Sequence, residues 1–300
     1  MAITNNCAKF LFYAKSIGVG FGKTVSLGRL NLYATKEGIQ KNINKFQNNK
    51  KEIADVDFSD GYSEPLFQIL GAESTDSLDY SDYENASIIH DLNKPLPENL
   101  KNKFDTIVDG GTIEHVFNFP VAIKNCMEAL KVGGHYIGIS PSNNQMGHGF
   151  YQFSPDLYYR IFSPENGFAI KKMIITPLMK TEDDIRWFEV EDPKNVNSRV
   201  MLANNLPMSL MLIAEKLETV EIFRTTPQQT DYAITWAASD SIKTGLRPEN
   251  IGMSKHLYRK LLPKPLKNFV RNVYDLFTKE KIDTAELGEI NPLHYKEIKI

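Results

Sequence analysis

Cysteine is nearly absent, since Cys7 and Cys126 are the two cysteines among 300 residues. Two cysteines cannot build a disulfide framework, so we expect a reduced, cytoplasmic setting with both thiols packed as small core residues. Long apolar runs are also lacking. No stretch reaches the length of a membrane span, and the apolar patch at residues 10–13 is too short for a secretory signal.

A strong charge of either sign is absent too, because 35 basic and 37 acidic residues leave a formal net charge of −2. This balance gives no overall field to attract nucleic acid, so none is expected as a partner. The six histidines are scattered in the sequence, and no His/carboxylate spacing resembles a chelate, so no metal site is predicted. The alternative is a divalent ion held by residues that lie far apart in the sequence. The length suits one large domain, or one domain with an appendage.

Residues 104–140 are the most informative stretch. Apolar residues at 104–108 predict a buried strand, helical periodicity follows at 119–130, and the two glycines at 133–134 should end that helix before a new strand. Two strands joined through a helix form a parallel crossover, and ligands bind beyond the carboxyl ends of such strands. The residues at that edge are Asp109, Gly110, Gly111, Thr112, Glu114 and His115.

Two segments here carry a family resemblance: Glu-His-Val at 114–116 and Leu-Lys-Val-Gly-Gly at 130–134. Both resemble the second half of a class I S-adenosylmethionine-dependent methyltransferase domain. The match spans about 24–216 and continues through His148, Phe-Ser-Pro at 153–155 and Gly-Phe at 167–168. The resemblance implies a Rossmann-like α/β fold and S-adenosylmethionine as cofactor. Its sheet would be seven-stranded and mostly parallel, with helices on both faces and the last strand antiparallel.

The chain divides into three predicted parts. Residues 1–23 form an N-terminal helix and turn, 24–218 the methyltransferase-like domain, and 219–300 a C-terminal extension. Within the domain, 177–207 is longer than a hairpin needs and is interpreted as an insertion. This insertion covers either the substrate side or a subunit contact in a homodimer.

The loop after the first strand departs from the family. The resemblance implies an acidic residue and several glycines there, whereas this chain offers Gly28 followed by Arg29. Either the cofactor cradle is unusual or cofactor binding is lost. Gly28 would let the backbone approach the cofactor. Arg29 would pair with the cofactor carboxylate or remain a surface arginine.

Acidic residues end the next strands. Asp79, followed by Tyr80, closes the second strand, where an acidic residue commonly hydrogen-bonds ribose hydroxyls; alternatively, it opens the next turn. The resemblance places Asp91 and Leu92 beside adenine at the end of the third strand. We expect Asp79, Asp91 and Asp109 to converge around a nucleoside. Gly110, Gly111 and Glu114 complete the predicted cofactor-binding set.

A hydroxyl acceptor requires a base, and histidine is the default because its pKa lies near neutrality. His148 is the first choice, since its loop follows the fifth strand and should face the acceptor. His115 is the second, or else it anchors the loop after the fourth strand. The acceptor itself is expected to be a small polar molecule or a saccharide, methylated on oxygen.

Two C-terminal segments leave alternatives open. Aromatic, amide and carboxylate side chains at 225–236 suit sugar recognition, or the segment packs back on the domain. Basic and apolar residues alternate over 254–281, which predicts amphipathic helices split by Pro263 and Pro265. Such helices lie on the inner membrane surface as a peripheral contact, or dock on the domain with the basic face solvated.

Two other functions compete with a methyltransferase. A non-catalytic, methyltransferase-like binding protein is favoured by the degenerate loop around Gly28. An NAD-dependent oxidoreductase on a similar sheet ranks last, because the glycine fingerprint after the first strand is missing.

Overall fold

The computed structural model describes residues 2–46, 53, 55–178, 185–244 and 290–298, without the side chains of 238–244. The predicted basic helices at 254–281 therefore lie outside the described residues. Within the described part, no helix is both long enough and apolar enough to cross a membrane.

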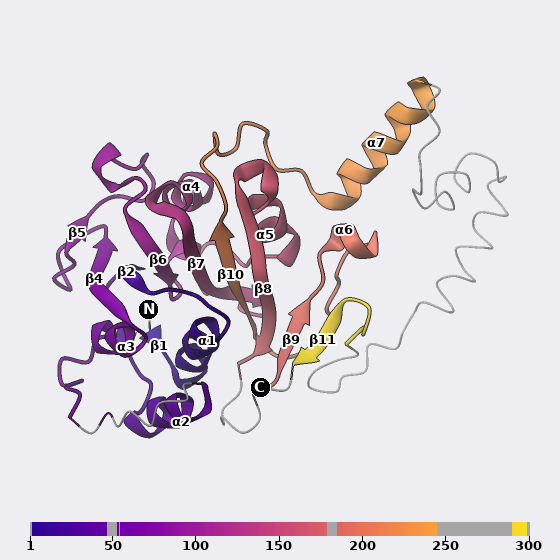
Figure 1. Cartoon of the computed structure of the whole chain (residues 1–300). Helices are drawn as coiled ribbons and strands as arrows, with labels where there is room; N and C mark the ends of the chain where they lie inside the picture. The colour runs from indigo at the N-terminus through magenta and orange to yellow at the C-terminus, as the bar shows by residue number, and fades with distance from the viewer. Residues whose placement is uncertain (1, 47–52, 54, 179–184, 245–289, 299–300) are drawn as a thin grey trace.

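One large mixed sheet organises the described residues (Figure 1). Its nine strands run in the order β11-β9-β8-β10-β7-β6-β2-β4-β5. Their bounds are β2 Gly22–Leu27, β4 Ala72–Asp79, β5 Ile88–Ile89, β6 Phe104–Asp109, β7 Leu130–Asn143, β8 Phe168–Pro177, β9 Trp187–Val190, β10 Met208–Lys216 and β11 Tyr295–Ile298. Two short strands, β1 Ala2–Ile3 and β3 Asn31–Leu32, pair separately.

The prediction of seven mostly parallel strands was wrong in number and direction. Four of the eight pairings are parallel, within β5-β4-β2-β6-β7, and four are antiparallel, within β7-β10-β8-β9-β11. The two additional strands have separate origins. β9 comes from the predicted insertion 177–207, and β11 comes from the C-terminal extension. Together they lengthen the sheet beyond β8.

The predicted antiparallel last strand is confirmed. β10 lies between β7 and β8 and runs antiparallel to both. Its central residues, 210–213, are buried, as expected for a strand covered on both faces.

The parallel half contains a change of direction that positions a site. From β2 the chain adds β4 and β5 on one side, and it then crosses to add β6 and β7 on the other side. A crevice forms beyond the carboxyl ends of the strands at such a switch point, and it is where open α/β sheets bind ligands. Here that point lies between β2 and β6.

Helices cover both faces of the sheet. α4 (Phe119–Ala129) and α5 (Pro155–Ile161) pack into one core cluster. α1 (Asn5–Ser16), α2 (Lys36–Phe46) and α3 (Glu64–Ile69) pack into the other. Neighbours on β6 divide between the clusters, Ile107 in the first and Val108 in the second, because successive strand residues point to opposite faces.

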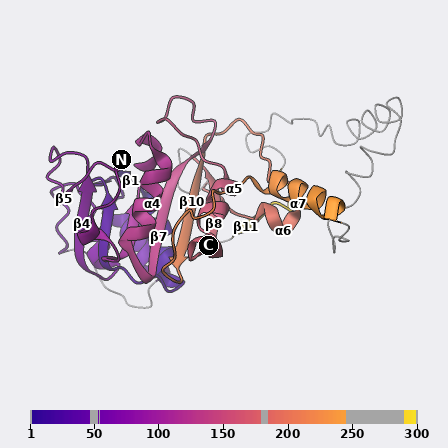
Figure 2. The same ribbon diagram turned by 90° about the horizontal axis from the view of Figure 1, so that it is seen from above.

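The remaining helices are short or lie at the margin. α6 (Pro193–Val196) and α7 (Thr230–Thr244) lie side by side near β9, away from the β4 and β5 end (Figures 1 and 2). Three 3-10 turns complete the elements: η1 Glu98–Leu100, η2 Ile113–His115 and η3 Pro164–Asn166.

The helix α4 ends earlier than its sequence predicts. It stops at Ala129, and Leu130 already pairs with Phe104 of β6, so the glycines at 133–134 lie inside β7. The helix end is instead capped by a distant lysine. The buried Lys216 Nζ donates to the carbonyl of Leu130 at 2.7 Å and to that of Met127 at 3.1 Å. A cation there suits the negative end of the helix dipole.

Candidate functional site

A pocket of about 460 Å³ opens at the carboxyl ends of β2 and β4, beside the switch point. This volume is within the roughly 300–1,000 Å³ typical of small-molecule sites. Five predicted cofactor residues line it: Gly28, Asp79, Tyr80, Asp91 and Leu92. The other lining residues are Leu78, His90, Asn93, Thr112, His115 and Val116. Loops far apart in the sequence therefore meet here.

Two carboxylates line the pocket, and Lys94 Nζ lies 3.4 Å from Oδ2 of one of them, Asp91. Asp79 ends β4, and Asp91 follows β5. Asp91 Oδ1 accepts hydrogen bonds from the Asn93 backbone N–H at 3.0 Å and from its side-chain amide at 2.9 Å. These bonds hold the pKa of Asp91 below its ordinary value, so the group is ionised at neutral pH. Paired carboxylates suit a ligand with hydroxyl or amino donors.

The turn after β2 passes the pocket in a left-handed conformation. Gly28 has φ +70°, which glycine adopts without steric cost. Its N–H donates to the carbonyl of Leu78 at 2.7 Å, and its own carbonyl accepts from the Ser26 hydroxyl at 2.7 Å. The first strand thereby ends in a turn fixed against β4.

Arg29 has protein partners and does not line the pocket. Its Nε donates to Glu64 Oε1 at 2.7 Å, and its Nη2 lies 3.2 Å from Asp60 Oδ2. The guanidinium also stacks 3.7 Å above the ring of Tyr62. The Arg29 guanidinium was one predicted partner of the cofactor carboxylate. It is instead engaged by two protein carboxylates and an aromatic ring.

Asp109 is fully buried behind the pocket rather than in its lining. Oδ2 accepts from the Tyr136 hydroxyl at 2.7 Å, and Oδ1 accepts from the Thr112 backbone N–H at 2.8 Å. Burial raises its pKa, while these two bonds oppose the rise. Asp109 therefore anchors the loop after β6, and of the three strand-end aspartates only Asp79 and Asp91 meet in the pocket.

The glycines of this loop are required for packing. Gly111 has φ +97°, and a Cβ on it would lie 3.1 Å from Glu114 Oε1. A Cβ on Gly110 would lie 3.0 Å from a methyl of Leu30. Neither glycine lines the pocket, so both shape the loop that presents Glu114 and His115.

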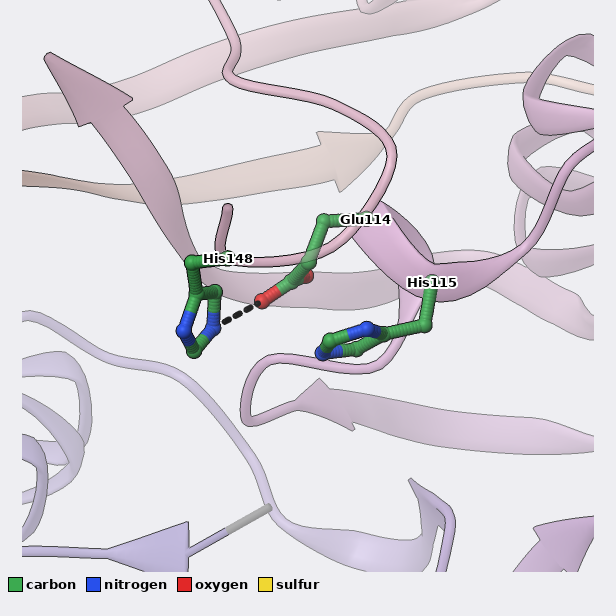
Figure 3. A group of neighbouring side chains, drawn as sticks. All are labelled: Glu114, His115 and His148. Atoms are coloured by element: carbon green, nitrogen blue, oxygen red, sulfur yellow. Dashed lines mark ion pairs between the residues drawn. The ribbon is translucent and has the colours of Figure 1, made fainter. Parts of the chain in front are cut away.

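Glu114, His115 and His148 form a cluster next to the pocket (Figure 3). The first two come from η2 after β6, and His148 comes from the loop after β7. One ligand atom from each side chain lies within 4.8 Å of the others. His148 Nε2 is 3.5 Å from Glu114 Oε1, and the ring centroids of His115 and His148 are 5.4 Å apart. His115 belongs to both the cluster and the pocket lining.

The cluster combines one buried acid with two exposed bases. The side chain of Glu114 is 1% exposed, and that of His148 is 54% exposed. Burial and the nearby charge of Asp109 raise the pKa of Glu114 to about 8. Partial desolvation of the His115 ring and the neighbouring His148 lower the pKa of His115, so that ring is mainly neutral near pH 7.

Backbone contacts fix the two loops of the cluster against each other. The carbonyl of Glu114 accepts from the backbone N–H of Phe150 at 2.8 Å and from that of Tyr151 at 3.3 Å. Gly149 permits this approach, since a Cβ there would lie 2.9 Å from the same carbonyl oxygen. The position of His148 relative to Glu114 is therefore set by the main chain.

The sequence did not reveal this cluster as a metal-binding group. His115 and His148 belong to different loops, and chelate spacings in sequence detect only ligands on one local element. Their meeting depends on β6 and β7 pairing in parallel, which brings the loops after both strands to one edge. The described residues contain one such group of histidine and carboxylate ligands.

Amide side chains, some of them from the loop after β7, line a second pocket of about 470 Å³. Its lining consists of Asn143, Asn144, Met146, Gln152, Asn204 and Asn205. Asn144 Nδ2 donates to the carbonyl and side-chain oxygens of Asn204 at 2.7 and 2.9 Å. The segment 225–236, predicted for sugar recognition, lies elsewhere: its Gln228, Gln229 and Asp231 help to line a third pocket of about 500 Å³. The aromatic residues of this segment, Tyr232 and Trp236, stack on each other with ring centroids 5.7 Å apart and line none of the three pockets.

No family model matches the sequence, and no curated protein matches it. Solved structures that resemble the chain include the MccD protein, at 12% identity and a TM-score of 0.41, over 71% of this chain and 99% of that one. A putative methyltransferase from Bacillus halodurans has 10% identity and a TM-score of 0.39, over 70% and 99%. An S-adenosylmethionine-dependent methyltransferase from Mesorhizobium loti has 15% identity and a TM-score of 0.38, over 69% and 97%.

Proposed function

We propose that this chain is an S-adenosylmethionine-dependent methyltransferase that methylates a hydroxyl group of a small polar or sugar-type acceptor. One observation carries the proposal: the pocket at the switch point is lined by Gly28, Asp79, Asp91 and Leu92 and by His115 of the titratable cluster. His115 therefore belongs both to the pocket that would hold the nucleoside and to the cluster that would accept a proton.

The pocket residues fit the cofactor by their chemistry. Asp79 would accept hydrogen bonds from the ribose hydroxyls, as an acidic residue at this strand end does in nucleotide-binding α/β folds. Leu92, which is buried, and Asp91 would contact the adenine. Gly28 would face the methionine end, where its turn brings the backbone close. When bound, the cofactor supplies a methyl group on a sulfonium, and the C–S bonding pair returns to sulfur as the acceptor oxygen gains the methyl.

The protein's own contribution to such a reaction is positioning and proton removal. Holding acceptor and donor in line can supply about 7–11 kcal/mol of the barrier reduction. The acceptor's hydroxyl proton has to leave as its oxygen attacks. His148 and His115, the predicted bases, stand beside the pocket as parts of one cluster with Glu114. Proton removal is therefore assigned to this cluster.

The amide pocket supports a polar acceptor. Side-chain amides both donate and accept hydrogen bonds, which suits neighbouring hydroxyl groups. Asn143 and Gln152 flank the loop that carries His148, so an acceptor held by these amides would lie close to the cluster. This placement favours a polyhydroxylated molecule over an apolar one.

Calorimetric titration of the full chain with S-adenosylmethionine tests the proposal. We expect micromolar binding. Asp79→Ala should weaken it roughly 10- to 150-fold, the ratio for about 1.5–3 kcal/mol lost with a charged hydrogen bond. Asp82→Ala is the matched control, because Asp82 is an exposed carboxylate three positions away that does not line the pocket. Equal affinities of the two variants would contradict the assignment.

A non-catalytic, methyltransferase-like binding protein is the second candidate. The turn after β2 contains a single glycine, Gly28, and the neighbouring Arg29 is engaged by Glu64 and Asp60. Absence of binding to S-adenosylmethionine, and to its demethylated product, would favour this function. A parallel titration with NADH tests the oxidoreductase alternative.

A further inference from the structure

We propose that Glu114, His115 and His148 bind a divalent transition-metal ion beside the pocket. Two imidazoles and one carboxylate place a ligand atom each within 4.8 Å of one another. Figure 3 shows the three side chains converging from η2 and the β7 loop on one small volume. An ion at their centre would need only side-chain adjustments to reach bonding distances of about 2.0–2.2 Å.

The donor set selects the class of ion. Imidazole nitrogen suits zinc, iron, cobalt and nickel, whereas magnesium and calcium prefer all-oxygen sites. Two histidines and one carboxylate are three protein ligands, which leaves coordination positions open for another molecule. The cluster therefore has the composition of a reactive metal site rather than of a closed structural one.

A second, independent observation points to a missing cation. Glu114 Oε2 is buried and has no hydrogen-bond partner among the described residues. The ion-pair partner of this side chain in the same residues is His148, at 3.5 Å, and the buried acid Asp109 is a charged neighbour that disfavours a second negative charge. A buried oxygen atom without a partner is costly whether the acid is charged or neutral, and coordination of a metal ion is one of the usual ways in which proteins provide the partner.

The geometry also gives an ion access and a rigid frame. His115 and His148 are exposed, so an ion can enter from solvent. The main-chain bond from Phe150 to the Glu114 carbonyl fixes the two loops before any ion binds. Preorganised ligands lose little freedom on binding, which favours affinity.

The role of this ion rests on the proposed function, whereas its binding does not. A hydroxyl group on an open coordination position has a lowered pKa and loses its proton to solvent more readily. A nitrogen that holds an ion cannot also take a proton. With the ion bound, His148 therefore acts as a ligand, and the ion activates the acceptor in place of a histidine base.

The test is titration of the chelator-treated full chain with CoCl₂, followed by visible absorption, and with ZnCl₂, followed by calorimetry. We expect one ion per chain. Loss of a group that only supports a metal ligand lowers metal affinity roughly 10- to 100-fold. Glu114→Gln and His148→Ala each remove a ligand, so each should lower the affinity for the ion by at least that factor. His90→Asn is the matched control, since His90 lines the pocket outside the cluster and should bind ions like the parent chain.

Absence of saturable Co²⁺ and Zn²⁺ binding at millimolar concentration would overturn the inference, and so would equal affinities in the parent chain and in His148→Ala. Because His148 is exposed, that variant should fold normally. Titration of the metal-free chain with S-adenosylmethionine separates the two proposals. Cofactor binding without metal binding refutes the metal site alone, and metal binding without cofactor binding refutes the proposed function.

Discussion

Tyr136→Phe should destabilise the folded chain measurably, because it removes one hydroxyl from the buried anchor of the site. The Tyr136 hydroxyl donates to Asp109 Oδ2 at 2.7 Å, and both residues are 0% exposed. Burial raises the pKa of Asp109, but the bonds from Tyr136 and Thr112 favour its charged form. A hydrogen bond to that charged form contributes about 1.5–3 kcal/mol, and water cannot replace the lost donor in this core. The Thr112 N–H would remain on Oδ1. We therefore expect a loss of about 2–3 kcal/mol in the free energy of unfolding.

Tyr158→Phe provides the matched control in the same core cluster. Its hydroxyl is equally buried, but it meets only the neutral Ser140 hydroxyl, at 3.3 Å. A long neutral bond should contribute about 0.5–1.5 kcal/mol. Urea unfolding at pH 7, followed by circular dichroism, measures both costs. If the two variants lose the same stability, Asp109 is not an ionised anchor and this account of the loop after β6 is refuted.

Two further predictions concern the scaffold. Lys216→Met should cost about 2–4 kcal/mol of stability, because the carbonyls of Leu130 and Met127 lose a buried charged donor; a loss below 0.5 kcal/mol in urea unfolding would contradict this role. His135 is buried without a hydrogen-bond partner, and burial lowers its pKa from 6.5. Its neutral form is favoured on folding, so stability is full above pH 6.5 and falls as the pH drops through that value towards the folded pKa. His135→Leu should reduce the fall in melting temperature between pH 7 and 5. An unchanged dependence of the melting temperature on pH would exclude His135 as the cause.

The pocket could be predicted from the sequence because strand ends can be located by local signals. A hydrophobic run fixes where β6 stops, whereas β4 is mostly polar and its end is marked by Leu78 directly before Asp79. Parallel pairing then brings the residues after each strand to one edge. Asp79, Asp91 and Gly28 meet for this reason. The position of β10 was predictable from the family resemblance, which covers that part of the chain.

Other features depend on contacts that no local pattern encodes. β11 pairs with β9 across about a hundred residues of sequence, so the length of the sheet was underestimated. Arg29 pairs with Asp60 and Glu64, which lie more than thirty residues further along the chain. Tertiary packing brings them together, so the pairing could not be read from a local pattern. Glu114, His115 and His148 were each predicted as site residues, but their meeting in one cluster was not, since the fold alone joins the two loops.

The central claim is that the pocket beside β2 and β4 holds the nucleoside of the methyl donor. A crystal structure of the full chain grown with S-adenosylhomocysteine tests this most directly. We predict density for the ligand in this pocket, with the ribose hydroxyls hydrogen-bonded to Asp79 and the adenine against Leu92. Ligand density at another place, or a pocket filled by protein side chains at saturating ligand, would contradict the claim.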